Sequence, residues 1–124
     1  MATLTVQKPT LRGATSILSG TDMGIALTTC FSGGDDFPNT GVEFLLIKNG
    51  HAATARTVTF DAPKGCNFGL SANAAHDCAV LVSALHSKLV GPFPTGTFND
   101  TNAKVQMTYS DAAADLTVAV LSLS

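Results

Sequence analysis

The chain has 124 residues, of which 45% are hydrophobic and only 13% are charged, and its formal net charge at pH 7 is −2. This length suits one domain with a core of its own. The weak negative charge argues against nucleic-acid binding, which needs clustered Lys and Arg, and no run approaches the ~20 apolar residues of a membrane span. A surface poor in charge and rich in small polar residues is typical of a protein held in an assembly, and equally of a small β domain with threonine-rich faces.

The N-terminal stretch MATLTVQKPT lacks a basic region followed by an apolar run. We therefore expect no secretory signal and synthesis in a reducing cytosol. Polar and apolar residues alternate in Thr3–Val6, which predicts a short strand, and Lys8-Pro9 breaks the pattern. We interpret residues 1–12 as an N-terminal arm and 13–124 as a single domain. The arm could add a strand to a neighbouring chain, so it supplies the first candidate partner contacts: Thr3, Leu4, Thr5 and Val6.

A second candidate contact region follows two short predicted strands, TSILSG at 15–20 and GIALTT at 24–29. The next stretch, SGGDDFPNTG at 32–41, has the composition of a loop. Calcium is one alternative there, because hard cations take loop oxygens, but the stretch lacks the regular acidic spacing of an EF-hand. The loop tip has no partner in the pattern of predicted strands and is expected to contact a partner through Asp36, Phe37, Pro38 and Asn39.

The middle of the chain predicts three strands. VEFLLIKNG at 42–50 reads as a central strand, because its residues 44–47 are apolar on both faces. ARTVTF at 55–60 alternates cleanly and ends at Asp61-Ala62-Pro63. Lys64–Ala75 has no period and is expected to be a long loop. DCAVLVSAL at 77–85 could form a short helix, but the β-branched Val80 and Val82 favour a strand.

The stretch LVGPFPTGTFND at 89–100 predicts a corner between two sheets. Gly91-Pro92 and Pro94-Thr95-Gly96 turn the chain, while Phe93 and Phe98 point into the core. Two further strands, AKVQMTYS at 103–110 and DLTVAVLSLS at 115–124, are expected to be joined by a hairpin loop. With about seven to nine short strands and no amphipathic helix, the sequence predicts an all-β protein, an antiparallel β-sandwich of jelly-roll-like or immunoglobulin-like type.

No catalytic, cofactor or metal site is expected. His76, Asp77 and Cys78 are adjacent, and neighbouring strand residues point to opposite faces, so they do not suit a zinc site. Cys66 and Cys78 could pair if oxidised, but buried free thiols are favoured.

The two remaining histidines, His51 and His86, flank turns and are interpreted as solvated side chains. No GxSxG elbow or phosphate-binding loop is present.

A family resemblance rests on the order of five motifs: FPNTGVEFLLIKNG, ARTVTF, KLVGPFPTGTFND, KVQMTYSD and LTVAVLSL. In this order the chain resembles the small β-sandwich accessory head proteins of tailed bacteriophages, known as decoration or cement proteins. In that group a central strand ends in Lys-Asn-Gly, and a Gly-Pro-Phe corner, a Phe-Asn-Asp turn and a Val-x-x-Thr-Tyr-Ser strand follow. The resemblance covers Phe37 to Leu123, and the chain departs from the pattern in Lys64–Ala75.

This resemblance implies a non-enzymatic protein that binds the major capsid protein on the outer surface of the head and stabilises contacts between capsid subunits. The expected location is the virion, after synthesis in the host cytoplasm. A homo-trimer would suit the three-fold axes of a shell, and a dimer stays open. The alternatives are a head–tail connector, neck or tail component forming a single ring, and a carbohydrate-binding module, against which the lone Tyr109 and the absence of Trp argue. A small enzyme is disfavoured for lack of a catalytic constellation.

Overall fold

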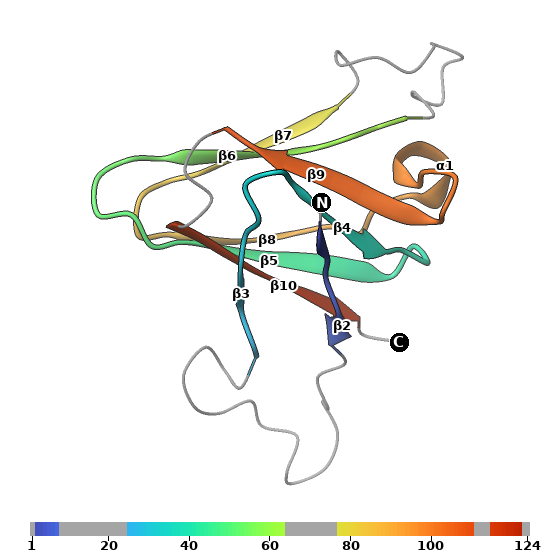
Figure 1. Ribbon diagram of the computed structural model, residues 1–124, viewed down its shortest axis with the longest axis horizontal. Coiled ribbons are helices and arrows are strands. Elements are labelled where there is room, and N and C mark those ends of the chain that lie inside the picture. Colours follow the sequence, from blue (N-terminus) through green and yellow to red (C-terminus); the bar gives the residue numbers. More distant parts are fainter. Residues whose placement is uncertain (1, 8–24, 64–76, 111–114, 123–124) are drawn as a thin grey trace, which may run out of the picture.

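Figure 1 shows the computed structural model, which describes residues 2–7, 25–63, 77–110 and 115–122. In these ranges the chain forms ten strands and one four-residue helix. In chain order the elements are β1 (Ala2–Thr3), β2 (Val6–Gln7), β3 (Thr28–Thr29), β4 (Asp35–Pro38), β5 (Glu43–Asn49), β6 (Arg56–Phe60), β7 (Cys78–Val82), β8 (Ser87–Val90), α1 (Thr95–Phe98), β9 (Lys104–Tyr109) and β10 (Leu116–Ser122). No helix in the described ranges has the length and hydropathy that crossing a membrane requires.

The strands form two sheets. The first sheet has the order β1-β4-β9-β6-β7, and the second has the order β2-β10-β5-β8, with β3 also pairing with β10. The prediction of an all-β fold is confirmed. The expectation of purely antiparallel pairing is wrong, because β1 lies parallel to β4 and β2 lies parallel to β10.

The two sheets share one hydrophobic core. Along β5, β6 and β9 the buried residues mostly alternate with more exposed ones, because successive side chains of a strand point to opposite faces. In β10 both faces are buried from Val118 to Ser122. The first sheet contributes Phe37, Val58, Phe60, Val105 and Met107 to this core, and the second contributes Leu45, Ile47, Leu116, Val118 and Val120. The sheets therefore lie face to face, as in a β-sandwich.

The outer face of the second sheet is also partly apolar. Ile25 and Leu27 pack there against Ala119 and Leu121 of β10, together with Leu46 of β5. This cover explains why β5 reads as apolar on both faces, and the central position predicted for it between β10 and β8 is confirmed.

Two sequence predictions about connections were wrong. β9 and β10 do not form a hairpin, because they belong to different sheets. β9 and β10 each turn an apolar face toward the same core, but from opposite sides. The alternation of residues in the sequence is the same for a hairpin and for a crossing between sheets, so it did not distinguish them. Asp35–Pro38 is strand β4 rather than a loop tip. The long loop predicted for Lys64–Ala75 and the strand predicted for 15–20 fall on residues outside the described ranges, Ala75 among them.

The corner between β8 and β9 anchors the core from one end. Phe93 is 2% exposed, and the centre of its ring lies 5.4 Å from that of Phe37, 4.8 Å from that of Phe60 and 5.6 Å from that of Phe98. Before it, Gly91 has φ +133°, and a Cβ there would lie 2.9 Å from the Glu43 carbonyl oxygen, so only glycine fits. The inward positions predicted for Phe93 and Phe98 are confirmed. The turn predicted at 94–96 is the start of helix α1.

Phe93→Ala should lower the free energy of unfolding by about 3–5 kcal/mol, because the lost ring leaves a cavity among three other aromatic rings. Chemical denaturation of the purified protein measures this. Phe31→Ala is the matched control, since Phe31 is 51% exposed and its loss should cost less than about 0.5 kcal/mol. Equal effects of the two variants would contradict this role of Phe93.

Candidate functional site

The first predicted contact segment is not an unpaired arm. Ala2 and Thr3 pair with Asp35 and Asp36 in the first sheet, and β2 pairs with Val120–Leu121 in the second. Leu4, between them, is 6% exposed and belongs to the core. Thr3 and Thr5 are exposed, and Val6 is half-buried. Residues 2–7 therefore clasp both sheets, while residues 8–12 of the predicted arm lie outside the described residues.

The second predicted contact region is also paired within the chain. Asp36, Phe37 and Pro38 lie opposite Gln106, Val105 and Lys104 of β9. Phe37 is fully buried and Asn39 is 3% exposed, so only Pro38 is exposed and Asp36 half-buried. The prediction that these residues lack a pairing partner within the chain was wrong. Gly33-Gly34 and Pro38 give this short strand the amino-acid composition of a loop.

Asn39 forms hydrogen bonds within the corner. Its Nδ2 donates to the Phe93 carbonyl oxygen (2.9 Å) and to Asn99 Oδ1 (2.7 Å), and Asn99 Nδ2 donates to the Asn39 carbonyl oxygen (3.0 Å). These bonds satisfy buried polar groups that would otherwise carry a desolvation penalty.

A second polar network lies at the opposite end of the sandwich, at the left of Figure 1. We call this the loop end. It comprises the β5–β6 connection at 50–55, the β7–β8 connection at 83–86, and Ser110 and Asp115, which bound the β9–β10 connection. Backbone bonds tie these parts together: Asn49 N–H donates to the His86 carbonyl oxygen (3.0 Å), and Gly50 N–H to that of Asp115 (2.8 Å).

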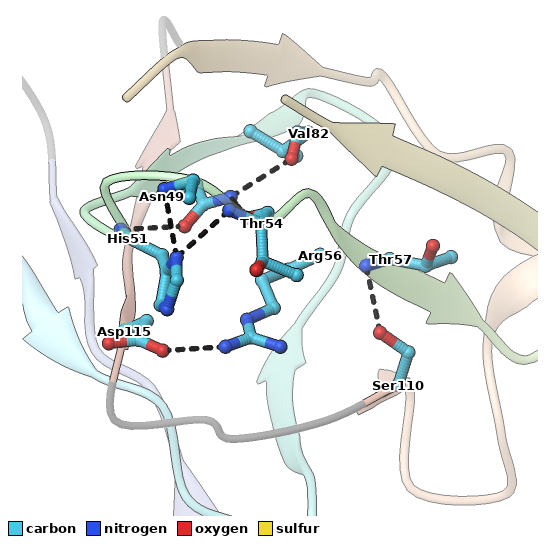
Figure 2. Close-up of polar contacts among 9 residues, drawn as sticks. Asn49, His51, Thr54, Arg56, Thr57, Val82, Ser110 and Asp115 are labelled. Atoms are coloured by element: carbon cyan, nitrogen blue, oxygen red, sulfur yellow. Dashed lines mark hydrogen bonds and ion pairs between the residues drawn. The ribbon is translucent and has the colours of Figure 1, made fainter. Parts of the chain in front are cut away.

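Asn49 is the hub of the loop end, as Figure 2 shows. It is 1% exposed. Its Nδ2 donates to the carbonyl oxygens of Thr54 and Val82, both at 3.0 Å, and its Oδ1 accepts the His51 N–H at 3.0 Å. One amide thus joins β5, the 50–55 connection and the end of β7.

His51 caps the same connection through its ring. Nδ1 accepts the N–H groups of Ala53 (3.0 Å) and Thr54 (2.9 Å). A neutral imidazole has one accepting nitrogen, so the proton sits on Nε2 while these bonds persist. Nε2 then has no lone pair for a metal or for a substrate proton. The ring acts as a structural acceptor in a half-buried side chain.

Arg56 closes the network from β6. Its side chain is 7% exposed, and Nη2 donates to Asp115 Oδ2 at 2.9 Å. Next to it, Ser110 Oγ accepts the Thr57 N–H at 3.0 Å, and Figure 2 shows this second tie between β6 and the end of β9. These contacts hold the loop end as one preorganised unit.

The loop end carries one large hydrophobic residue that is exposed, Leu85. Leu85 is 68% exposed and has φ +59°. Non-glycine residues seldom adopt this left-handed region, where Cβ crowds the carbonyl oxygen. The sequence did not indicate a left-handed residue here, because Leu85 was predicted to be the last residue of a strand. The observed strand β7 ends at Val82.

A polar pocket of about 160 Å³ lies on the outer face of the first sheet, lined by Thr59, Asp61, Asp77, Gln106 and Thr108. Asp77 Oδ1 accepts the Ala62 N–H at 2.9 Å. Partial burial, together with the neighbouring Asp77 carboxylate, raises the pKa of Asp61. The described residues hold no group of three or more His, Cys, Asp or Glu side chains that could bind a metal ion.

Three further titratable groups, Cys30, Asp35 and Tyr109, interact with one another. Tyr109 Oη donates to Asp35 Oδ2, which also accepts the Phe31 N–H at 3.1 Å. Burial raises the pKa of Cys30 to about 11 and that of Tyr109 further above its ordinary value. A thiol with so high a pKa is unreactive at neutral pH. These bonds occupy the Asp35 carboxylate. Asp35 and Asp36, the two acidic residues of the stretch considered for calcium, therefore do not offer two free carboxylates to an ion.

Of the other sequence candidates, Cys78 is free and half-buried, whereas Cys66 and His76 lie outside the described residues. His86 is exposed, and its Nδ1 lies 2.7 Å from the Ala84 carbonyl oxygen.

Asn49→Ala should lower the free energy of unfolding by about 1–3 kcal/mol, because the buried Val82 carbonyl loses its donor. Thermal or denaturant unfolding measures the loss. Asn102→Ala, at an exposed position, should change stability by less than about 0.5 kcal/mol. A similar small effect at Asn49 would show that the hub contributes little.

Removing the charge of Asp61 and removing that of Asp100 should have opposite effects on stability. The pKa of Asp61 is raised in the native state. As pH rises above the pKa of Asp61 in the unfolded chain, its ionisation therefore lowers the free energy of unfolding. Asp61→Asn should therefore stabilise the protein near pH 7, by less than about 1 kcal/mol because the site is solvated, and the gain should vanish near pH 3.

Asp100 is the control for the sign. Burial alone would raise its pKa, but hydrogen bonds from Gln106 Nε2 and from the backbone of Lys104 and Asn102 lower it. Its contribution is present above the unfolded pKa and is lost as pH falls through the native one. Asp100→Asn should destabilise the protein near pH 7, and stabilisation by this variant would contradict the assignment.

Known proteins offer no further guide to the site. No family model matches the chain, and neither a curated protein nor a solved structure matches it.

Proposed function

We propose that the chain is a non-enzymatic structural protein of a tailed-phage head, a decoration or cement protein that binds the outer surface of the capsid through its loop end. The resemblance in motif order between Phe37 and Leu123 supports the phage assignment. The low proportion of charged residues supports a protein held in an assembly. A β-sandwich of jelly-roll-like or immunoglobulin-like type is the fold we propose for it.

The observation that carries the proposal is Leu85. Its left-handed backbone costs free energy that Asn or Gly would avoid, and its side chain exposes an apolar surface to water. Neither cost improves the fold of the isolated chain. Both are offset if Leu85 enters a pocket on a partner, because buried apolar anchors dominate interface energies.

The network beneath Leu85 suits such an anchor. Asn49, His51 and the Arg56–Asp115 pair fix the connections around it, so little conformational entropy is lost on binding. Each contact with the major capsid protein can then be modest. Multivalent engagement across the shell lattice would raise the overall avidity and stabilise neighbouring subunits against internal pressure.

The test is co-sedimentation with phage heads stripped of the protein, with bound copies per head as the readout. Saturation at many copies, repeated over the lattice, is the expected result. Saturation at one ring's worth would instead assign the protein to the connector, neck or tail. Absence of binding would overturn the phage assignment, and soluble ligands, carbohydrates among them, would be the next class to test.

Leu85→Asn separates the anchor from the fold. It should weaken head binding at least about tenfold, while the free energy of unfolding stays equal or rises by about 0.5–1 kcal/mol as the backbone strain is relieved. Leu89→Asn is the matched control, because Leu89 is 60% exposed on β8, away from the loop end. If Leu85→Asn binds heads as tightly as the unmodified protein, Leu85 is not the anchor.

A further inference from the structure

The four borders of the two sheets are not equally protected. Exposed sheet borders invite pairing with other chains, and proteins blunt them with very short strands or with charges, lysine above all. On one side of the sandwich the border strands β1 and β2 have only two residues each. On the other side, β8 carries the exposed Lys88.

Strand β7 has none of these devices. It forms the other border of the first sheet, as Figure 1 shows in yellow beside β6. Its five residues are Cys-Ala-Val-Leu-Val, without a charge or a proline. Ala79 and Leu81 are exposed on its outer face, Leu81 to 54%.

The backbone of β7 presents hydrogen-bonding groups outward. The Ser110 N–H donates to the Thr57 carbonyl oxygen, so Thr57 and, by alternation, Thr59 face β9. The residues between them in β6 therefore face β7, where Val58 is paired with Val80. Along β7 the N–H and C=O groups of Ala79 and Leu81 then point away from β6. In the part of the chain that the structure describes, the sheet order ends at β7 and no strand pairs with this border.

We propose that β7 pairs antiparallel with β7 of a second copy of this chain, about a two-fold axis at Val80. In this register the two Val80 residues lie opposite each other as a non-hydrogen-bonded pair. Ala79 of each copy lies opposite Leu81 of the other, and these two residues exchange main-chain hydrogen bonds. On the outer face each exposed Leu81 meets the small Ala79 of the partner copy, so a large side chain packs beside a small one.

The occupant follows from this self-complementarity. A two-fold contact needs a surface that fits itself, and the large–small alternation of β7 does so about its central residue. The strand has no charge that would repel its own copy, whereas pairing of two β8 strands would bring Lys88 of each copy close together. The inference goes beyond the proposed function and does not depend on it, and it favours a dimer over the homo-trimer expected from the shell's symmetry.

The experiment compares two leucine-to-lysine variants of the purified chain without heads. Sedimentation velocity should show a monomer–dimer equilibrium in the micromolar range for the unmodified protein. Leu81→Lys should raise the dimer dissociation constant at least about tenfold, since it places like charges at the join. Leu89→Lys, an equally exposed leucine on the border strand β8, should leave it unchanged. Thermal unfolding at low concentration confirms that both variants are folded.

Amide hydrogen exchange tests the register independently. The Ala79 and Leu81 amides should become protected as concentration rises, while those of β8 should not. A protein that stays monomeric up to about 100 µM, a trimer, equal weakening by both variants, or unprotected Ala79 and Leu81 amides would overturn the proposal. Failure of head binding would leave these results untouched, so the two proposals fail separately.

Discussion

Insertion of Phe93 between the sheets is the constraint on which the rest of the structure depends. The residue comes from the connection between β8 and β9, so it ties the second sheet to the first where the chain crosses. Its ring meets phenylalanines from β4, β6 and α1. Its carbonyl oxygen is bound by Asn39. Apolar packing and amide bonding therefore fix the same residue, which sets the separation of the sheets at this end.

The other end of the sandwich is organised differently. There the sheets are joined by polar side chains, with Asn49 reaching from β5 to β7 and Arg56 reaching from β6 to Asp115. Apolar packing around Phe93 fixes one end of the sandwich, and polar side chains fix the other. The loop end is therefore ordered, while Leu85 stays exposed to solvent. The open border strand β7 runs along the side between the two ends, so the two proposed contacts use different surfaces.

Much of the fold could be predicted from local alternation. The strands at β6, β7 and β9 were recognisable from alternation, and those at β5 and β10 from their apolar residues on both faces. Phe93 was recognisable as an apolar residue between two turn signals. The parallel pairing of residues 2–7 could not be predicted, since a two-residue strand has no period. The loop end was missed because its key residues, Asn49 and His51, look like ordinary turn residues until their bonds are known.

The clasp formed by residues 2–7 has a consequence for biosynthesis. Val6 pairs with Val120, so strand β2 docks on a strand that the ribosome makes much later. The second sheet cannot be completed while β10 is still in the exit tunnel, and a nascent chain carries an unfinished sheet until then. Pairing between residues so distant in sequence is slow to form. A chain truncated before β10 would therefore leave β2 as an unpaired strand.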